Sequence, residues 1–230
     1  MDIIEPEEGE ILDIELEEDF LEKNRQLSVK NRALLDKNKV RAIDVMGSIG
    51  SGKTSLIQLL LSILGKKFRI AVIAGDLTTS IDAERLRQPE VKIIQVNTGK
   101  ECHLDARLIE RALKSLPLSS TDLLFIENVG NLICPADFPL GTHQRIVVIS
   151  VTEGPWMVVK HPYIFRDADI VVINKIDLAE AMQVSPEKLT QDVSSINPNA
   201  KVIPVSCRYK KGIFEVVSAL ELNLSNKGII

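Results

Sequence analysis

A glycine-rich segment that ends in lysine and threonine has the clearest chemical signature in the chain. Residues 47–54 read G-S-I-G-S-G-K-T, between a strand-like run at 40–46 and an apolar, helix-like run at 54–64. Glycines let backbone N–H groups wrap a phosphate chain, which a Cβ would obstruct. In such a loop Lys53 reaches the β- and γ-phosphates and the Thr54 hydroxyl binds Mg²⁺. The predicted triphosphate contacts are Gly47, Ser48, Gly50, Ser51, Gly52, Lys53, Thr54 and Ser55.

A second pattern indicates the base. A buried-looking strand ends in Asn174-Lys-Ile-Asp177, an N-K-x-D string. The Asp177 carboxylate can accept hydrogen bonds from guanine N1–H and N2–H₂, whereas adenine lacks this donor pair and would leave a buried charge unpaired. We expect Asn174 to hold neighbouring loops together and the Lys175 stem to lie across the base. The loop after a later strand supplies the remaining predicted contacts, Ser206 and Cys207.

Three carboxylates lie between these motifs, where a triphosphate and its Mg²⁺ must be sensed. Asp76 ends the second strand-like run, Asp82 follows six residues later, and Glu127 ends another strand before Gly130. We predict that Thr54, Asp76, Asp82 and Glu127 surround Mg²⁺, in part through water, and that the Gly130 N–H follows the γ-phosphate. The alternative is that Asp76 caps a strand end and Asp82 a helix.

Hydrolysis requires groups that stabilise the phosphate charge and orient the attacking water. Lys53, Asp82 and Glu127 are the predicted catalytic residues. No arginine finger or catalytic glutamine stands out in this stretch. We therefore predict Mg²⁺-dependent GTP hydrolysis that is slow unless a partner, or a second copy of the chain, completes the site.

A set of soft metal ligands adjoins the phosphate-sensing segments. Cys102 and His103 precede a helical pattern, and Cys134 follows the Glu127 strand. Thiolate and imidazole suit Zn²⁺ or Ni²⁺, but three donors leave a tetrahedral site open. Two copies of the chain across a two-fold axis would bring six candidate ligands together. The alternative is that Cys102 is a small buried hydrophobe and His103 a helix-start residue. Of the remaining cysteine and histidines, Cys207 is interpreted as a structural residue, and His143 and His161 as surface or loop residues.

Composition narrows the class of protein. The 230 residues hold three cysteines, an odd number that argues for free thiols or metal ligands rather than a disulfide framework. No stretch has the roughly 20 apolar residues of a membrane span, and we expect a cytoplasmic protein. Eleven acidic residues precede the first basic one, Lys23, within a net charge of −4. The basic residues that follow are too scattered to predict nucleic-acid binding.

Strand-like and helix-like runs alternate along most of the chain. This alternation predicts an α/β fold with a mainly parallel sheet and helices on both faces, as in P-loop NTPases. Residues 1–16 are expected to form an acidic, flexible tail, 17–38 an N-terminal helix, and 39–230 a P-loop GTPase domain. Further strands are predicted at 69–74, 91–96, 123–126, 145–151, 170–173 and 201–205, and helices at 104–116, 186–196 and 212–222.

From Val40 to Asp177 the chain resembles the HypB family of nickel-incorporation GTPases, which act in hydrogenase maturation within the dimer-activated P-loop GTPases. The resemblance is carried in part by M-G-S-I-G-S-G-K-T and A-G-D-L-T-T-S-I-D-A-E-R, and its most specific strings are C-H-L-D-A and E-N-V-G-N-L-I-C-P-A. Urease nickel-chaperone GTPases are similar but carry a C-P-H motif. Some HypB proteins have an N-terminal cysteine cluster or histidine-rich stretch, whereas here the first such residues are Cys102 and His103.

The resemblance implies a GTP-favoured homodimer in which Cys102, His103 and Cys134 of both subunits bind Ni²⁺ or Zn²⁺ at the interface. It also implies delivery of nickel to a hydrogenase large-subunit precursor, together with a small nickel metallochaperone of the same pathway. Two alternatives remain at this stage. One is a GTPase whose interface zinc is purely structural and which acts as a partner-binding switch. The other is a P-loop kinase or ATPase, against which Asn174 and Asp177 argue.

Overall fold

The structure is a computed structural model that describes residues 14–76, 81–99 and 101–222. A seven-stranded sheet with the order β3-β2-β4-β1-β5-β6-β7 forms its centre, and every pair of neighbouring strands is parallel. This confirms the predicted fold class. The strands are β1 (Arg41–Gly47), β2 (Ile70–Asp76), β3 (Lys92–Asn97), β4 (Leu123–Glu127), β5 (Gln144–Ser150), β6 (Ile170–Asn174) and β7 (Lys201–Pro204).

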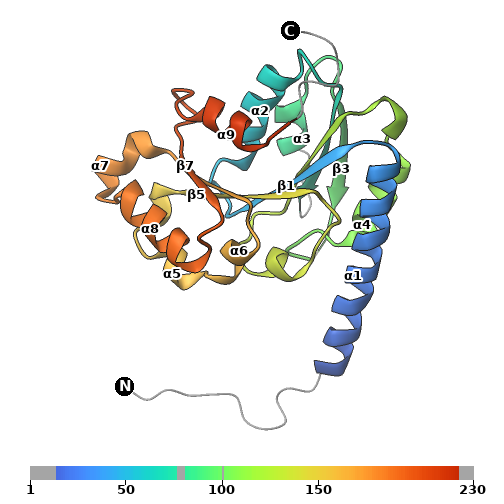
Figure 1. Cartoon of the computed structure of the whole chain (residues 1–230), viewed down its shortest axis with the longest axis horizontal. Helices are drawn as coiled ribbons and strands as arrows, with labels where there is room; N and C mark the ends of the chain where they lie inside the picture. The colour runs from blue at the N-terminus through green and yellow to red at the C-terminus, as the bar shows by residue number, and fades with distance from the viewer. Residues whose placement is uncertain (1–13, 77–80, 100, 223–230) are drawn as a thin grey trace.

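Helices cover both faces of the sheet (Figure 1). One face packs against α2 (Lys53–Leu64), α3 (Ile81–Leu86) and α9 (Ile213–Ala219). The opposite face packs against α1 (Ile14–Lys37) and α4 (Ala106–Lys114) at one side, and against α5 (Met157–Lys160), α6 (Tyr163–Arg166) and α8 (Pro186–Ile196) at the other. A short helix, α7 (Ala179–Met182), follows residues 174–178, which carry the N-K-x-D string and which we call the base loop. Among the described helices, none has the length and apolar character needed to cross a membrane.

The strands follow from their composition. The central strands consist mainly of β-branched and other apolar residues, and β4 and β6 are buried at every position. Such continuous apolar runs are typical of parallel strands covered on both faces. Because all strands run the same way, their carboxyl ends meet at one edge of the sheet, where ligands bind in open α/β folds.

Boundaries differ from the sequence-based prediction in two places that bear on function. The N-terminal helix begins at Ile14 rather than at residue 17, and residues 1–13 of the predicted tail lie outside the described residues. Helix α4 begins at Ala106 rather than at Leu104, because the Asp105 side chain caps it by accepting from the Leu108 N–H at 2.7 Å. Cys102 and His103 therefore lie in a loop before the helix.

Side-chain amides dock α1 onto the domain. The Asn24 Oδ1 accepts from the Ala106 N–H at 2.7 Å, and its Nδ2 donates to the Pro139 carbonyl at 3.0 Å. The Ala106 N–H belongs to the first turn of α4, whose amides have no partner within their own helix. Asn31 donates to the Ala106 and Leu140 carbonyls. The helix thus holds the start of α4 by hydrogen bonds as well as by the fully buried Leu35.

We predict that Asn24→Ala lowers the free energy of unfolding by about 2 kcal/mol, because it leaves the buried Ala106 N–H unpaired. Urea denaturation followed by circular dichroism measures this. Lys23→Ala, at the exposed neighbouring position, is the matched control and is expected to change stability by less than about 0.5 kcal/mol. Equal effects of the two substitutions would contradict the docking role of Asn24.

Candidate functional site

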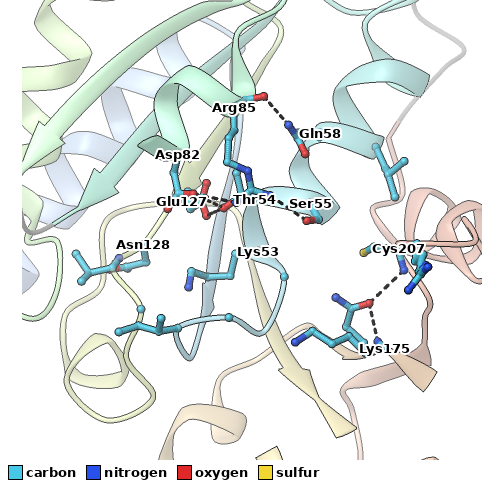
Figure 2. Close-up of a pocket in the computed structure, with 18 of the residues that line it drawn as sticks. Lys53, Thr54, Ser55, Gln58, Asp82, Arg85, Glu127, Asn128, Lys175 and Cys207 are labelled. Carbon is cyan, nitrogen blue, oxygen red and sulfur yellow. Dashed lines mark hydrogen bonds and ion pairs between the residues drawn. The ribbon is translucent and has the colours of Figure 1, made fainter. Parts of the chain in front are cut away.

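The glycine-rich loop and the carboxyl ends of the strands enclose a cavity of about 890 Å³ (Figure 2). The loop requires glycine at two positions with positive φ. A Cβ on Gly47, at φ 146°, would lie 2.1 Å from the Val148 carbonyl oxygen, and one on Gly52, at φ 104°, would lie 2.2 Å from Asn174 Nδ2. Larger residues would push these segments apart, so the loop depends on its contacts with β5 and with the base loop.

Lys53 lies buried at the bottom of this loop. Its ammonium group donates to the Gly47 carbonyl at 3.1 Å and to the Ser48 carbonyl at 3.0 Å. Burial lowers the pKa of Lys53, while the neighbouring Glu127 and Asp82 carboxylates raise it. The carboxylates therefore favour the charged form that a phosphate chain needs.

Thr54, Asp82 and Glu127 converge at one side of the cavity (Figure 2). The Thr54 hydroxyl oxygen lies 2.6 Å from Glu127 Oε1 and 3.0 Å from Asp82 Oδ1. One hydroxyl has a single proton, so it cannot donate to both carboxylates at once. The pKa of Glu127 is raised to about 7, mainly by burial and also by Asp82, against the lowering effects of Thr54 and Lys53.

These oxygens fit a hard divalent cation. The second oxygen of Glu127, Oε2, is buried and has no hydrogen-bond partner among the described residues. Mg²⁺ binds through hydroxyl, carboxylate and water oxygens, and its charge would favour ionised Glu127. Asp82 lies in the first turn of α3 and contacts Thr54, so its carboxylate is placed at the phosphate side of the cavity. Asp76 lines the same cavity at the end of β2.

The cavity residues that were missed from the sequence include two polar ones, Arg85 and Gln58. Arg85 of α3 donates to Asp82 Oδ1 at 3.2 Å and to Ser55 Oγ at 3.3 Å, and Gln58 of α2 lies beside it (Figure 2). No arginine finger was identified in this stretch from the sequence. Arg85 follows Asp82 by three residues, so both face the cavity once the segment is helical. That spacing was the available signal.

The base loop forms the other side of the cavity. Asn174 Nδ2 donates to the Ser51 carbonyl at 2.8 Å, and its Oδ1 accepts from the Lys175 and Cys207 N–H groups. It thus joins three loops, as predicted. The Ser206 hydroxyl donates to Asp177 Oδ1 at 2.5 Å and orients that carboxylate.

Most of the predicted nucleotide contacts line the cavity, and a few support it from behind. The lining residues among them are Gly50, Gly52, Lys53, Thr54, Ser55, Gly130, Asn174, Lys175, Asp177 and Cys207. The supporting residues are Gly47, Ser48, Ser51 and Ser206, which act through backbone carbonyls or, for Ser206, through its hydroxyl. Additional apolar lining comes from Ile49, Leu59 and Leu178.

The three predicted soft ligands meet in a separate cluster. The Sγ atoms of Cys102 and Cys134 lie 2.9 Å apart, Cys102 Sγ lies 3.9 Å from His103 Nδ1, and the ligand atoms of all three lie within 4.8 Å of one another. One chain therefore brings together the neighbouring Cys102 and His103, which sequence spacing alone did not guarantee. Cys207 is not part of this cluster; burial raises the pKa of its thiol to about 11.

Aromatic packing fixes the imidazole of this cluster. His103 is 7% exposed and its ring stacks on Phe138, with ring centroids 3.8 Å apart, and Phe20 of α1 also packs against Phe138. Burial lowers the pKa of His103, which favours the neutral imidazole that binds metal. His143 has a different role, because its Nδ1 accepts from the Ala42 N–H in β1.

The sheet order, glycine-rich loop and base loop define a P-loop nucleotide-binding protein. A family model described as "CobW/HypB/UreG, nucleotide-binding domain" matches residues 41–204. The probable hydrogenase maturation factor HypB of Methanocaldococcus jannaschii is 52% identical over 208 residues, which cover 90% of this chain and 94% of that protein. The chain belongs to the HypB hydrogenase maturation factors of this family.

Solved structures agree with this assignment. The crystal structure of HypB from Archaeoglobus fulgidus is 46% identical with a TM-score of 0.82, covering 88% of this chain and 98% of that one. HypB from Helicobacter pylori, crystallised in complex with nickel, is 33% identical with a TM-score of 0.81 and covers 90% and 100% of the two chains.

The pKa of Glu127 gives a stability prediction for the protein without nucleotide or Mg²⁺. Between pH 4.5 and about 7 the folded chain keeps a proton that the unfolded chain has lost, so stability falls as pH rises through this window. Between pH 5 and pH 8, the free energy of unfolding of wild type should fall by on the order of 2 kcal/mol relative to that of Glu127→Gln, as measured by urea denaturation. Glu215→Gln, at an exposed position on α9, is the matched control. Parallel stability curves for wild type and Glu127→Gln would contradict the prediction.

Proposed function

We propose that this protein is a GTP-hydrolysing metallochaperone that binds nickel, or zinc in its place, and supports nickel insertion during [NiFe]-hydrogenase maturation. The observation that carries the proposal is the position of the Cys102, His103 and Cys134 cluster. Cys134 follows Glu127 in the same segment, and Glu127 contacts the Thr54 hydroxyl in the nucleotide cavity. A carboxylate at the phosphate site and a thiol at the metal cluster are thus parts of one short stretch of backbone.

Guanine and the phosphates are recognised by different residues of the cavity. Asp177, oriented by Ser206, accepts from the guanine edge, and the Lys175 stem covers the base. Lys53 exchanges its two carbonyl partners for phosphate oxygens. Bound Mg²⁺ supplies neutralising charge at the phosphates, and Thr54, Asp82 and Glu127 are the residues that would hold it.

Metal binding depends on a set of three donor residues, one fewer than a permanent structural site has. Structural zinc sites have four protein ligands, whereas the described residues of one chain offer three. A fourth position allows a metal cargo to enter and leave by ligand exchange. Cys102 shares its thiol proton with Cys134, which raises the pKa of Cys102, so metal binding must release protons and should weaken at low pH.

A second copy of the chain is the proposed partner in the GTP-bound state. Ile49 lies in the glycine-rich loop (residues 47–54), called the phosphate loop from here on, and is 82% exposed; Ile133, beside Cys134, is 62% exposed, although both side chains are apolar. These side chains flank the nucleotide cavity and the metal cluster, and a second copy would cover them. The further proposed partners are a small nickel metallochaperone and a hydrogenase large-subunit precursor, and the proposed location is the cytoplasm.

Guanine specificity can be tested at Asp177. We predict that Asp177→Asn lowers GTP affinity by about 100-fold, because the charged acceptor for N1–H and N2–H₂ is lost. Xanthosine triphosphate should bind the variant better than GTP does, because the Asn Nδ2 can donate to the C2 carbonyl of xanthine. Competition against a fluorescent guanine nucleotide measures both affinities. Wild type that binds ATP as tightly as GTP would instead support a kinase or ATPase.

Nucleotide-linked metal binding is tested by Ni²⁺ and Zn²⁺ titrations in GDP and in a non-hydrolysable GTP analogue, with mass followed by light scattering. We expect a dimer with the analogue and a metal affinity that differs by at least about fivefold between the two states. Cys134→Ser should remove the metal site. Cys207→Ser, titrated without nucleotide, is the matched cysteine control and should keep wild-type stoichiometry. Equal affinity in both states would indicate structural zinc and a partner-binding switch.

A further inference from the structure

Residues 127–134, which we call the switch segment, join the nucleotide cavity to only one of the three metal ligands through the backbone. Glu127 at its start contacts Thr54, and Cys134 at its end belongs to the metal cluster. Any movement of this segment therefore moves Cys134 directly. Cys102 and His103 lie in a different loop, between β3 and α4, so the covalent chain gives them no such connection.

Two amide side chains of the switch segment cross to that loop. Asn128 Oδ1 accepts from the Leu104 N–H at 3.1 Å, and Asn131 Nδ2 donates to the Cys102 carbonyl at 3.3 Å. The Cys102 carbonyl and the Leu104 N–H belong to the two peptide groups on either side of His103. The switch segment thus holds the backbone of this ligand from both sides.

The same two asparagines are attached to β1, the strand that leads into the phosphate loop. Asn128 Nδ2 donates to Asp44 Oδ1 at 3.3 Å, and the backbone of Asn131 forms an antiparallel bridge with Gly47. Asn128 and Asp44 are 1% and 0% exposed, so water cannot replace this bond and its loss is costly. Asn128 is therefore a fixed anchor.

Asn131 is placed to respond to the phosphate loop. It is half-buried, it pairs with the first glycine of the loop, and its neighbour Gly130 touches Ile49, where a Cβ would lie 2.3 Å from the Ile49 side chain. A shift of the phosphate loop is thus transmitted to Asn131 by direct contact. Its Nδ2 reaches the Cys102 carbonyl on the opposite side.

We propose that Asn131 is the positioning residue through which the phosphate loop sets Cys102 and His103 relative to Cys134. This inference rests on the proposed nucleotide-linked metal transfer and identifies the bond that carries the linkage. When Asn131 holds the Cys102 carbonyl, the three donors face one ion. When the switch segment moves and this bond lengthens, Cys134 separates from the other two donors, and metal affinity changes with nucleotide state.

An isosteric substitution isolates this bond. Asn131 Oδ1 accepts from the Ile133 N–H at 2.9 Å, which an aspartate oxygen can also do. In Asn131→Asp the second oxygen faces the Cys102 carbonyl, so a donor–acceptor pair becomes two acceptors. The turn at Ile133 is preserved, the contact between the loops is lost, and one negative charge is added. Asn131→Ala is the second variant, which removes the bond without adding a charge.

The experiment is the titration of the full chain with Ni²⁺ alone and with Zn²⁺ alone, in GDP and in the non-hydrolysable GTP analogue. We expect both Asn131 variants to bind metal, but with affinities in the two nucleotide states that agree within about twofold, whereas those of wild type differ by at least about fivefold. Asn199→Asp makes the same substitution at an exposed position between α8 and β7, and should keep the wild-type ratio.

Each other outcome overturns the inference in a distinguishable way. A wild-type affinity ratio in both Asn131 variants would show that the linkage bypasses this residue, while leaving the proposed function intact. Loss of metal binding in both nucleotide states would show that Asn131 only holds the site together. A ratio of one in wild type would overturn nucleotide-linked transfer itself, and this inference with it.

Discussion

The contact between the Thr54 hydroxyl and the Glu127 carboxylate is the interaction on which both sites depend. It exists because β4 lies between β1 and β2 in the sheet, which puts the end of β4 directly beside the phosphate loop. Two carboxylates that share one hydroxyl proton, one of them the buried Glu127, are costly without a cation, as the raised pKa of Glu127 indicates. The same strand end continues into Cys134, so strain or relief at the phosphate site has a direct route to the metal cluster.

Amide side chains connect the parts of this protein that hydrophobic packing leaves apart. Asn174 joins the phosphate loop to the base loop, Asn128 and Asn131 join the switch segment to the loop of His103, and Asn24 joins α1 to the start of α4. An amide offers a donor and an acceptor at once without the desolvation cost of a charge. Such bonds fix geometry more than they add stability, which suits loops whose relative positions define both sites.

Sequence analysis predicted well where function requires a local pattern. The glycine loop, the N-K-x-D string and all seven strands lie where the sequence placed them, because glycine spacing and β-branched runs are local signals. It did less well where a contact joins distant segments. Arg85 was missed as a cavity residue, because its side chain is directed into the cavity by the packing of α3 beside α2. The start of α4 was placed too early, because the Asp105 cap outweighed the apolar Leu104.

By itself the sequence determined which chemical groups are present: a phosphate loop, a carboxylate for guanine, oxygen ligands for a hard cation and three soft donors. Only the tertiary structure decided that Cys102, His103 and Cys134 of one chain lie within reach of one another, and that Asn128 and Asn131 hold the backbone on both sides of His103. The physical reason is that these contacts depend on strand order. Residues near 103 follow β3 and residues near 130 follow β4, and they become neighbours because β2 pairs with both strands; no local pattern encodes that order.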